Sequence, residues 1–333
     1  MIISASNKKV KNIAALLSRS RERKKRGVFV VEGIKMFTEA PIDRILEVYI
    51  EETLFGEILA GKSDEEFVKK LDQITGCLQK KDGKNCAIEN NGISVEFEIV
   101  RDDIFRKMSD TQTPQGILCV VKRLDETFED LMKENQMKEC QKTEYQEKGN
   151  HQKDNHHKDK HQKDNQKKDY QEKDGQAERE CAKGLYLILE DIQDPGNLGT
   201  MIRAGEGAGV SGIIMSDKTV DVYNPKTIRA TMGSIYRVPF CYVSDLHRCI
   251  KDLQECDIKV YAAHLKGEEA YDLQNYCRSV AFLIGNEGNG LKDETAELAD
   301  AYIKIPMLGK VESLNAAIAA TLLVYEAARQ RRN

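Results

Sequence analysis

Several features that assign a chain to a membrane, to secretion or to a disulfide framework are missing. The sequence has no uninterrupted apolar run of about 18 residues, so we expect no transmembrane helix. Its first 27 residues lack an apolar core followed by a small-residue cleavage site, so we expect no secretory signal. The nine cysteines are scattered and form no CxxC pair. This usage is typical of reduced, buried thiols in a cytoplasmic protein.

The net charge of −4 conceals a basic N-terminal region. Residues 1–40 hold ten Lys or Arg against three Glu, a local charge of +7. Such a region attracts polyanions because it releases their counterions. A solvated helix end is the alternative, and we favour contact with nucleic acid. The candidate RNA-binding residues are Arg19, Arg21, Arg23, Lys24, Lys25 and Arg26.

The middle of the chain differs in composition from both ends. In residues 141–180 only two tyrosines and one alanine are apolar, and "HQKDN" and "YQEK" each occur twice. Such a segment cannot bury enough apolar surface to offset its ordering entropy, so we expect a linker or insertion. Four of the six histidines lie there, but no cysteine accompanies them, and we expect no metal site. We therefore expect an RNA-binding domain over 1–125, a linker with the insertion over 126–183, and a second domain over 184–333.

Both domains alternate helical and strand patterns, which predicts an α/β fold. In the first we expect helices over 12–18 and 63–74, and strands over 28–33, 45–51, 95–100 and 116–121. In the second we expect strands over 185–190, 212–216, 258–264, 280–285 and 302–307, with helices over 198–209, 224–233 and from Ser313 onward. The strands of the second domain are nearly continuously apolar. That pattern indicates a parallel sheet with helices on both faces.

A glycine-rich stretch, "LIGNEGNGL", follows the expected strand 280–285. Its spacing is not the Gly-x-Gly-x-x-Gly of dinucleotide-binding folds, and it comes late in the domain. A phosphate-binding loop is excluded as well, because Leu291 stands where that motif needs lysine. Without a phosphate motif, the glycines can still let the backbone approach a flat ligand closely.

Two further stretches contain candidate functional residues. In "EDIQDPGNLGTMIRAGEGAGV" we expect Asn197 to cap a helix after an Asx-Pro-Gly turn. Arg203 lies in an otherwise small and apolar part of that helix, which indicates a partner for its guanidinium. In "IPMLGKVESLNAAIAATLLVYEAARQRR" we expect a strand ending at 305–307 and a helix capped by Ser313. The alanines that follow Ser313 allow close packing, including packing against another chain.

Together the three stretches resemble the motifs of the SpoU/TrmH family of RNA ribose 2′-O-methyltransferases, within the SPOUT superfamily. The first matches Asn-x-Gly-x-x-x-Arg at Asn197, Gly199 and Arg203. The second matches Gly-x-Glu-x-x-Gly at Gly285, Glu287 and Gly290. The third matches Pro-Met…Ser-Leu-Asn at Pro306, Met307, Ser313, Leu314 and Asn315. Each motif is weak alone, whereas all three in order are specific. The N-terminal region is similar to the family's substrate-binding domain, which resembles small ribosomal RNA-binding proteins.

The resemblance implies a C-terminal parallel sheet tied in a trefoil knot, an exception to the rule that chains avoid threading. It also implies S-adenosylmethionine bound at the knot and a homodimer with its sites at the interface. The cofactor-binding residues that it implies are Gly285, Asn286, Gly290, Ile305, Met307, Ser313 and Leu314. The catalytic residues that it implies are Arg203, Asn197, Glu287 and Asn315.

The implied reaction is attack of a ribose 2′-hydroxyl on a sulfonium methyl group. Arg203 is either the base or an electrostatic stabiliser, and we favour the second role because a guanidinium keeps its proton in proteins. Asn197 would orient Arg203 or the ribose, and Glu287 would pair with Arg203 or hold the knot loop. We expect large-subunit ribosomal RNA as the substrate. Transfer RNA is one alternative, and a non-catalytic RNA-binding protein of ribosome assembly is another.

Overall fold

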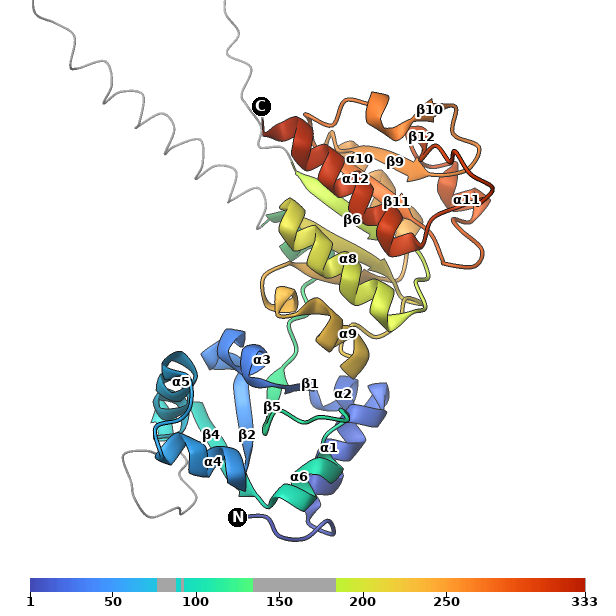
Figure 1. The fold of residues 1–333 in the computed structure, drawn as a ribbon. Coiled ribbons are helices and arrows are strands. Elements are labelled where there is room, and N and C mark those ends of the chain that lie inside the picture. Colours follow the sequence, from blue (N-terminus) through green and yellow to red (C-terminus); the bar gives the residue numbers. More distant parts are fainter. Residues whose placement is uncertain (77–87, 91–92, 134–183, 333) are drawn as a thin grey trace, which may run out of the picture.

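The computed structural model describes residues 1–76, 88–90, 93–133 and 184–332. Two β-sheets with their own helices lie one above the other, and the chain passes from the first sheet to the second (Figure 1). The charged segment over 141–180 and its histidines lie outside the described residues. Within the described residues, no helix is both long enough and apolar enough to span a bilayer.

The first sheet has five strands in the order β1-β5-β2-β4-β3. These strands are β1 (Val28–Glu32), β2 (Ile45–Glu51), β3 (Ile88–Asn90), β4 (Ile93–Val100) and β5 (Ile117–Lys122). β5 pairs antiparallel with β1 and β2, while β2 and β4 are parallel. The helices are α1 (Lys8–Ser18), α2 (Ser20–Arg26), α3 (Ile34–Glu39), α4 (Glu52–Leu59), α5 (Glu65–Thr75) and α6 (Asp102–Met108), with a short 3-10 turn η1 (Ile42–Arg44). The mixed sheet and its helices form the small α/β domain that the sequence predicts.

The second sheet has seven strands in the order β10-β12-β9-β11-β6-β7-β8, and every neighbouring pair is parallel. Its strands are β6 (Leu185–Leu189), β7 (Gly212–Ser216), β8 (Phe240–Val243), β9 (Lys259–Ala263), β10 (Glu269–Ala270), β11 (Val280–Ile284) and β12 (Ala301–Lys304). The helices are α8 (Pro195–Ala208), α9 (Pro225–Thr231), α10 (Leu246–Glu255), α11 (Asp293–Ala296) and α12 (Ala316–Arg331), with 3-10 turns η3 (Ser234–Tyr236) and η4 (Tyr271–Leu273). The parallel sheet is confirmed. The trefoil knot stays a prediction.

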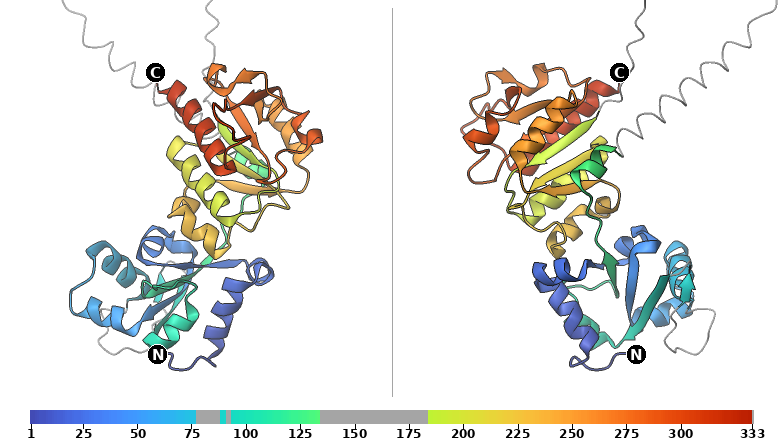
Figure 2. Two further views of the ribbon diagram at one scale, coloured as in Figure 1. Left: turned by 45° about the vertical axis from the view of Figure 1, so that its right-hand side comes forward. Right: turned by 180° about the vertical axis from the view of Figure 1, so that it is seen from behind.

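Alternate residues of the central strands pack into two separate cores, which is why these strands are apolar throughout. Leu187 and Phe282 face α8 and α12 on one side of the sheet. Ile188 and Leu283 face α10 on the other side. Helices therefore cover both faces, and α8 lies beside α12 in both views (Figures 1 and 2).

Two expected helix caps are wrong by a few residues. Helix α8 is capped by Asp194, whose side chain accepts a hydrogen bond from the backbone N–H of Asn197. Helix α12 is capped by Asn315, which accepts from the backbone N–H groups of Ala317 and Ile318. Asn197 is therefore inside its helix, and Ser313 precedes its own helix. In each case the cap is the Asx residue at the point where the backbone leaves the extended region.

The small residues of α12 also serve a different purpose from the expected one. Ala317 and Ala320 are buried within the chain, where α12 packs against α8 and the sheet. The exposed side of the helix carries larger apolar groups, Ile318 and Tyr325. The expected packing of these two alanines against a second chain is therefore wrong, because their surface is already covered.

Polar and aromatic contacts join the two domains. Arg23 of α2 donates two hydrogen bonds to Asp221, at 2.9 and 2.7 Å. The ring of Tyr223 stacks near Phe29 of β1, and its hydroxyl accepts a hydrogen bond from the backbone N–H of Leu124. Figure 2 shows this junction from two further sides, with α2 and β1 below α9.

Candidate functional site

A cavity of about 620 Å³ opens at the carboxyl ends of β9, β11 and β12. These three strands are neighbours in the parallel sheet, so the loops that follow them converge although they are far apart in sequence. The first turn of α12 and the loop before it complete the wall. The lining includes Gly285, Asn286, Gly290, Ile305, Met307, Ser313 and Leu314. The residues that the family resemblance assigns to the cofactor therefore lie around one cavity.

The glycine loop after β11 folds tightly back on itself. Asn286 and Gly290 exchange two backbone hydrogen bonds of 3.0 and 2.9 Å. A Cβ atom at Gly285 would overlap the backbone of Gly290 and Leu291, so this position tolerates no side chain. Gly290 has a φ of +69°, in the left-handed region that favours glycine. Gly285 thus serves a close approach of two backbone segments and Gly290 a turn, while the expected close approach to a flat ligand stays a prediction.

The side chain of Asn286 holds this loop in shape. Its Oδ1 accepts hydrogen bonds from the backbone N–H groups of Gly288 and Asn289. Its Nδ2 donates to the carbonyl oxygen of Asp191, at 2.8 Å. One amide thus ties the glycine loop to the segment that follows β6.

A buried carboxylate anchors the far end of the loop. Glu190 is 3% exposed and accepts from the backbone N–H of Lys292 and from the hydroxyl of Thr295. The ammonium of Lys292 in turn donates to Asp191, at 2.8 Å. A buried charge is tolerated only when it is paired and hydrogen-bonded, and Glu190 meets both conditions because the same ammonium lies 3.4 Å from its Oε1. The segments that follow β6 and β11 are therefore joined at two places, by Asn286 within the glycine loop and, just after that loop, by the contact of Glu190 with Lys292.

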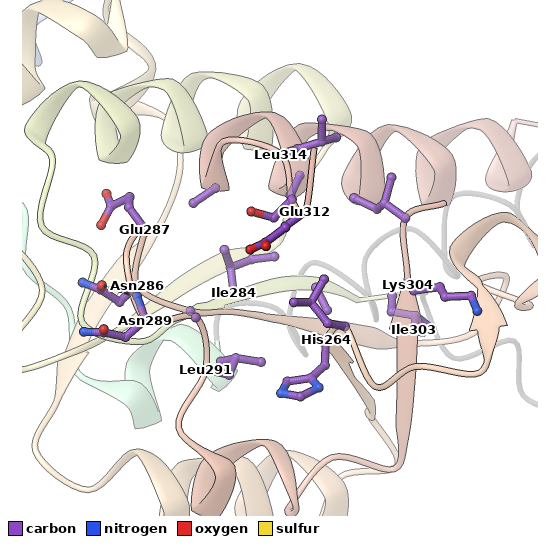
Figure 3. Close-up of a pocket in the computed structure, with 18 of the residues that line it drawn as sticks. His264, Ile284, Asn286, Glu287, Asn289, Leu291, Ile303, Lys304, Glu312 and Leu314 are labelled. Carbon is purple, nitrogen blue, oxygen red and sulfur yellow. Dashed lines mark hydrogen bonds between the residues drawn. The ribbon is translucent and has the colours of Figure 1, made fainter. Parts of the chain in front are cut away.

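Glu287 lies on the side of the loop that faces the start of α8 (Figure 3). Its carboxylate accepts from the backbone N–H groups of Gln193 and Asp194 and from Nδ2 of Asn197, each at 3.0 Å. Burial by itself would raise the pKa of Glu287, but the hydrogen bonds from Asn197 and the two backbone groups outweigh this effect and hold the pKa below 4.5. Of the two roles expected for Glu287, the structure favours holding the loop over pairing with Arg203.

Asn197 and Asn315 meet at the same place. Nδ2 of Asn315 donates to Oδ1 of Asn197, at 3.0 Å. Because Asp194 caps the helix, the side chain of Asn197 is available for this contact. Asn315 both caps α12 and reaches Asn197. Three of the four candidate catalytic residues, Asn197, Glu287 and Asn315, thus form one hydrogen-bonded cluster beside the cavity.

Arg203 stands apart from that cluster. It is exposed on α8, six residues after Asn197, which is about 9 Å along a helix. It is not among the residues that line the cavity, and it makes no hydrogen bond or ion pair with another described residue. A single copy of the chain therefore does not bring Arg203 to the cavity.

The six candidate RNA-binding residues differ in their exposure to solvent. Arg23 is 3% exposed, and besides Asp221 it donates to the carbonyl oxygens of Leu16 and Leu17. Its prediction as an RNA-binding residue is wrong, because its donors are already used inside the protein. The other five are exposed and leave a cationic surface on α2 and on the residue that precedes it: Arg19, Arg21, Lys24, Lys25 and Arg26.

The sequence analysis did not single out four charged or polar residues of the cavity wall, namely His264, Asn289, Lys304 and Glu312. His264 directly follows β9, Lys304 ends β12, and Glu312 precedes the Ser-Leu-Asn motif. Figure 3 shows Glu312 and His264 on opposite sides of the cavity, with Lys304 extending away from its centre. The available signal was the rule that ligands bind beyond the carboxyl ends of parallel strands, which applies to 264 and 304.

Two family models match the chain. Residues 184–325 match the SpoU rRNA Methylase family, and residues 7–119 match the MRM3-like substrate binding domain. A 23S rRNA (guanosine(2553)-2′-O)-methyltransferase, RlmP of Bacillus subtilis, is 37% identical over 42% of this chain and 56% of its own length. The 23S rRNA (guanosine-2′-O-)-methyltransferase RlmB of Xanthomonas campestris is 35% identical over 47% of this chain and 63% of its own length. The chain thus spans less than two thirds of these relatives.

Solved structures share the fold over nearly the whole chain. The SpoU methyltransferase AviRb from Streptomyces viridochromogenes, in complex with the cofactor AdoMet, has a TM-score of 0.69 at 20% identity and covers 98% of this chain and 99% of its own. An AdoMet-bound rRNA methyltransferase from Sinorhizobium meliloti has a TM-score of 0.66 at 24% identity, with coverage of 98% and 97%. At these identities the likeness concerns the fold.

Proposed function

Because residues 184–325 belong to the SpoU rRNA Methylase family, we propose that this protein transfers a methyl group from S-adenosylmethionine to a ribose 2′-hydroxyl of RNA. The main support for the proposal is that a ligand-sized cavity and a cluster of polar side chains lie next to each other. A cavity beneath the glycine loop lies directly beside the cluster of Asn197, Glu287 and Asn315. The proposed binding site of the methyl donor is therefore adjacent to this polar cluster, which we call the reaction edge.

The cavity suits an adenosine-containing ligand. Its volume of about 620 Å³ lies within the usual range for small-molecule sites. The backbone crowding at Gly285 supplies a wall of peptide groups, and Ile284, Ile303 and Leu314 supply apolar surface. The residues that would hold the donor are Gly285, Asn286, Gly290, Ile305, Met307, Ser313 and Leu314. When bound, S-adenosylmethionine supplies an electrophilic methyl group on a positively charged sulfur.

The chain's own residues would position the ribose and stabilise charge. Glu287 fixes Asn197 and the start of α8, and Asn315 fixes the start of α12 against it. Arg203 would donate one hydrogen bond to the developing oxyanion and one to the neighbouring phosphate, because its planar guanidinium can donate to two oxygen atoms at once. Asn197, with its amide already oriented, would hold the ribose.

Arg203 would act in a homodimer. It carries no partner among the described residues and lies outside the cavity of its own chain. The family resemblance implies sites at the interface of two copies. We therefore propose that dimer formation brings Arg203 to a reaction site that one chain leaves incomplete.

We propose ribosomal RNA as the substrate class. The similar proteins from Bacillus and Xanthomonas are named as 23S rRNA methyltransferases, and the N-terminal domain matches a substrate-binding model. The exposed cations of α2 would contact the phosphate backbone. This substrate also supports a cytoplasmic location. Transfer RNA remains the alternative substrate.

Labelled methyl transfer tests the proposal. The protein is incubated with S-adenosylmethionine carrying a labelled methyl group and with total RNA, and 2′-O-methyl positions are mapped in cells with and without the gene. We expect incorporation into large-subunit ribosomal RNA and the loss of one methyl position without the gene. Tight RNA binding without any incorporation would contradict the enzyme and favour the non-catalytic assembly protein. Incorporation into transfer RNA alone would contradict the ribosomal substrate.

A further inference from the structure

We propose that Glu312 makes the cavity select a cationic ligand over its neutral counterpart. In terms of the proposed function, on which this inference rests, the protein would bind the methyl donor more tightly than the demethylated product. The residue would thus set the ligand preference of the cavity and would take no part in bond making.

Two carboxylates line the cavity, and they differ in their surroundings. Glu287 accepts three hydrogen bonds from the start of α8, so its charge is already compensated. Glu312 also lines the cavity, but it is exposed and has no hydrogen bond or ion pair to any residue that the structure describes. The carboxylate of Glu312 is therefore the one left to interact with a ligand.

Figure 3 shows the side chain of Glu312 directed into the cavity between the glycine loop and the start of α12. It lies three residues before Asn315, whose amide contacts Asn197 at the reaction edge. Glu312 is thus a lining residue on the short segment that leads to the cluster of Asn197, Glu287 and Asn315.

The cationic groups of the wall leave this charge available. Lys304 extends away from the cavity centre, and His264 lies on the opposite side of the cavity from Glu312 (Figure 3). Nδ1 of His264 accepts a hydrogen bond from the backbone N–H of Lys266, and its ring lies against Tyr302 at a centroid distance of 5.3 Å. The described neighbours thus supply no cation that is paired with Glu312.

The two ligands differ by one positive charge. In the transfer, the bond between sulfur and the methyl carbon breaks, a bond between the ribose oxygen and that carbon forms, and the hydroxyl proton passes to solvent. The sulfur keeps the bonding electron pair and changes from a sulfonium to a neutral thioether. The adenosine, amino and carboxylate groups are the same in both ligands. A carboxylate near the sulfur therefore distinguishes them by charge alone.

This preference would help the reaction cycle. Product that has lost its positive charge also loses the attraction to Glu312, so fresh donor displaces it more readily. Because Glu312 is exposed, the effect has the size of a surface ion pair. We expect a contribution of about threefold to fivefold in the ratio of dissociation constants.

Isothermal titration calorimetry on the full-length protein tests this inference. The ligands are S-adenosylmethionine, S-adenosylhomocysteine and sinefungin, in which a protonated amine replaces the sulfonium. The test variant is Glu312→Gln, which keeps the shape and removes the charge. The matched control is Glu294→Gln in α11, an exposed glutamate that does not line the cavity. Thermal unfolding confirms that both variants are folded.

We expect Glu312→Gln to weaken S-adenosylmethionine and sinefungin by about threefold to fivefold and to leave S-adenosylhomocysteine unchanged. Added salt should reduce the preference in the wild-type protein and in Glu294→Gln, but not in Glu312→Gln. Equal weakening of all three ligands, or an unchanged ratio, would overturn the role of Glu312 while leaving the proposed function intact. A wild-type protein that binds none of the three ligands would overturn the proposed function as well.

Discussion

Gly285 and Gly288 belong to one loop but have different surroundings. A Cβ atom at Gly285 would overlap the backbone of residues 290 and 291, and Gly290 is itself held by two backbone hydrogen bonds to Asn286. A Cβ atom at Gly288 would meet only Oδ1 of Asn286, at the ordinary distance of 3.5 Å. The glycine motif thus contains one position fixed by backbone crowding and one that has room for a side chain.

Alanine substitutions separate these two positions. Gly285→Ala must push the two arms of the loop apart, so we expect the affinity for S-adenosylmethionine to fall by about tenfold or more, which corresponds to about 1.4 kcal/mol. Gly288→Ala should bind the donor nearly as well as the wild-type protein. Calorimetric titration of both variants provides the comparison. Similar affinities for both would mean that the crowding at Gly285 does not shape the donor site.

A lysine substitution at Arg203 tests whether the shape of the guanidinium or only its positive charge matters for methyl transfer. Lysine keeps the charge but loses the planar fork. If Arg203 donates one hydrogen bond to the reacting oxygen and one to the neighbouring phosphate, Arg203→Lys should lower the single-turnover methylation rate by about 100-fold or more. Donor affinity should barely change, because Arg203 does not line the cavity. Turnover close to that of the wild-type protein would exclude the two-bond role, and loss of donor binding would indicate a structural residue.

The carboxylate of Glu287 makes part of the stability dependent on pH. Burial acts to raise its pKa, but the hydrogen bonds from Asn197 and the backbone leave it depressed below 4.5. A depressed carboxylate pKa contributes stability that is present above the unfolded value and is lost as the pH falls through the folded value. We expect Glu287→Gln to melt a few degrees below the wild-type protein at neutral pH. The difference should shrink as the pH falls below about 4.5. Melting curves across this range decide the point, and a constant difference would contradict it.

At the scale of elements, helix α2 has two sides with separate roles. Its buried side carries Arg23, which binds Asp221 and two carbonyl oxygens of α1. Its outer side carries the exposed cations proposed for RNA. The Gly27 cap at a φ of 65° then turns the chain directly into β1. The helix is therefore held against both domains and keeps its cationic side toward solvent.

A substitution on the buried side of α2 should lower stability, whereas one on the exposed side should lower RNA affinity. Arg23→Met leaves Asp221 without its cation and should destabilise the protein by about 3–5 kcal/mol, the scale for breaking a buried ion pair. Arg21→Met should leave the melting temperature unchanged, lower RNA affinity and reduce the salt dependence of binding by about one unit of slope. Denaturant unfolding and RNA binding at several salt concentrations test both. Equal effects of the two substitutions on stability would contradict the division.

At the scale of the whole molecule, the outer side of α12 is the surface that we propose for the dimer. Ile318 is 52% exposed and Tyr325 is 46% exposed, while the inner side packs on α8. Two copies related by a two-fold axis would cover this side, because such an interface uses the same surface on both chains. The division of the chain at 1–125, 126–183 and 184–333 also stays a proposal at this scale, as does the knot.

A charge on α12 should separate the two copies. Ile318→Asp places an unpaired carboxylate in the proposed interface, so we expect a monomer at micromolar concentration and loss of methyl transfer. The control is Leu59→Asp in α4, which changes an exposed leucine of the other domain. Light scattering measures the mass of each variant. A dimer that persists in Ile318→Asp would place the interface elsewhere, and a monomeric wild-type protein would contradict the dimer.

The sequence by itself determined the features that repeat along the chain. Continuous apolar runs predicted the parallel sheet, because strands buried on both faces must be apolar at every position. The glycines after the strand 280–285 predicted a loop whose backbone can approach a ligand closely, and the motif order led to the family. Each of these patterns lies within a short segment of the chain, so the sequence of that segment is enough to identify it.

Only the tertiary structure decided which side chains meet. Arg23 looked like its exposed neighbours, and it is buried because Asp221, 198 residues later in the chain, lies against it. Asp194 and Asn315 cap the helices instead of Asn197 and Ser313, because the place where the backbone turns depends on how α8 and α12 pack. Glu312 faces the cavity because strands distant in sequence end at the same edge of the sheet. Contacts between distant residues depend on how the elements assemble, and a pattern of neighbouring residues does not contain that information.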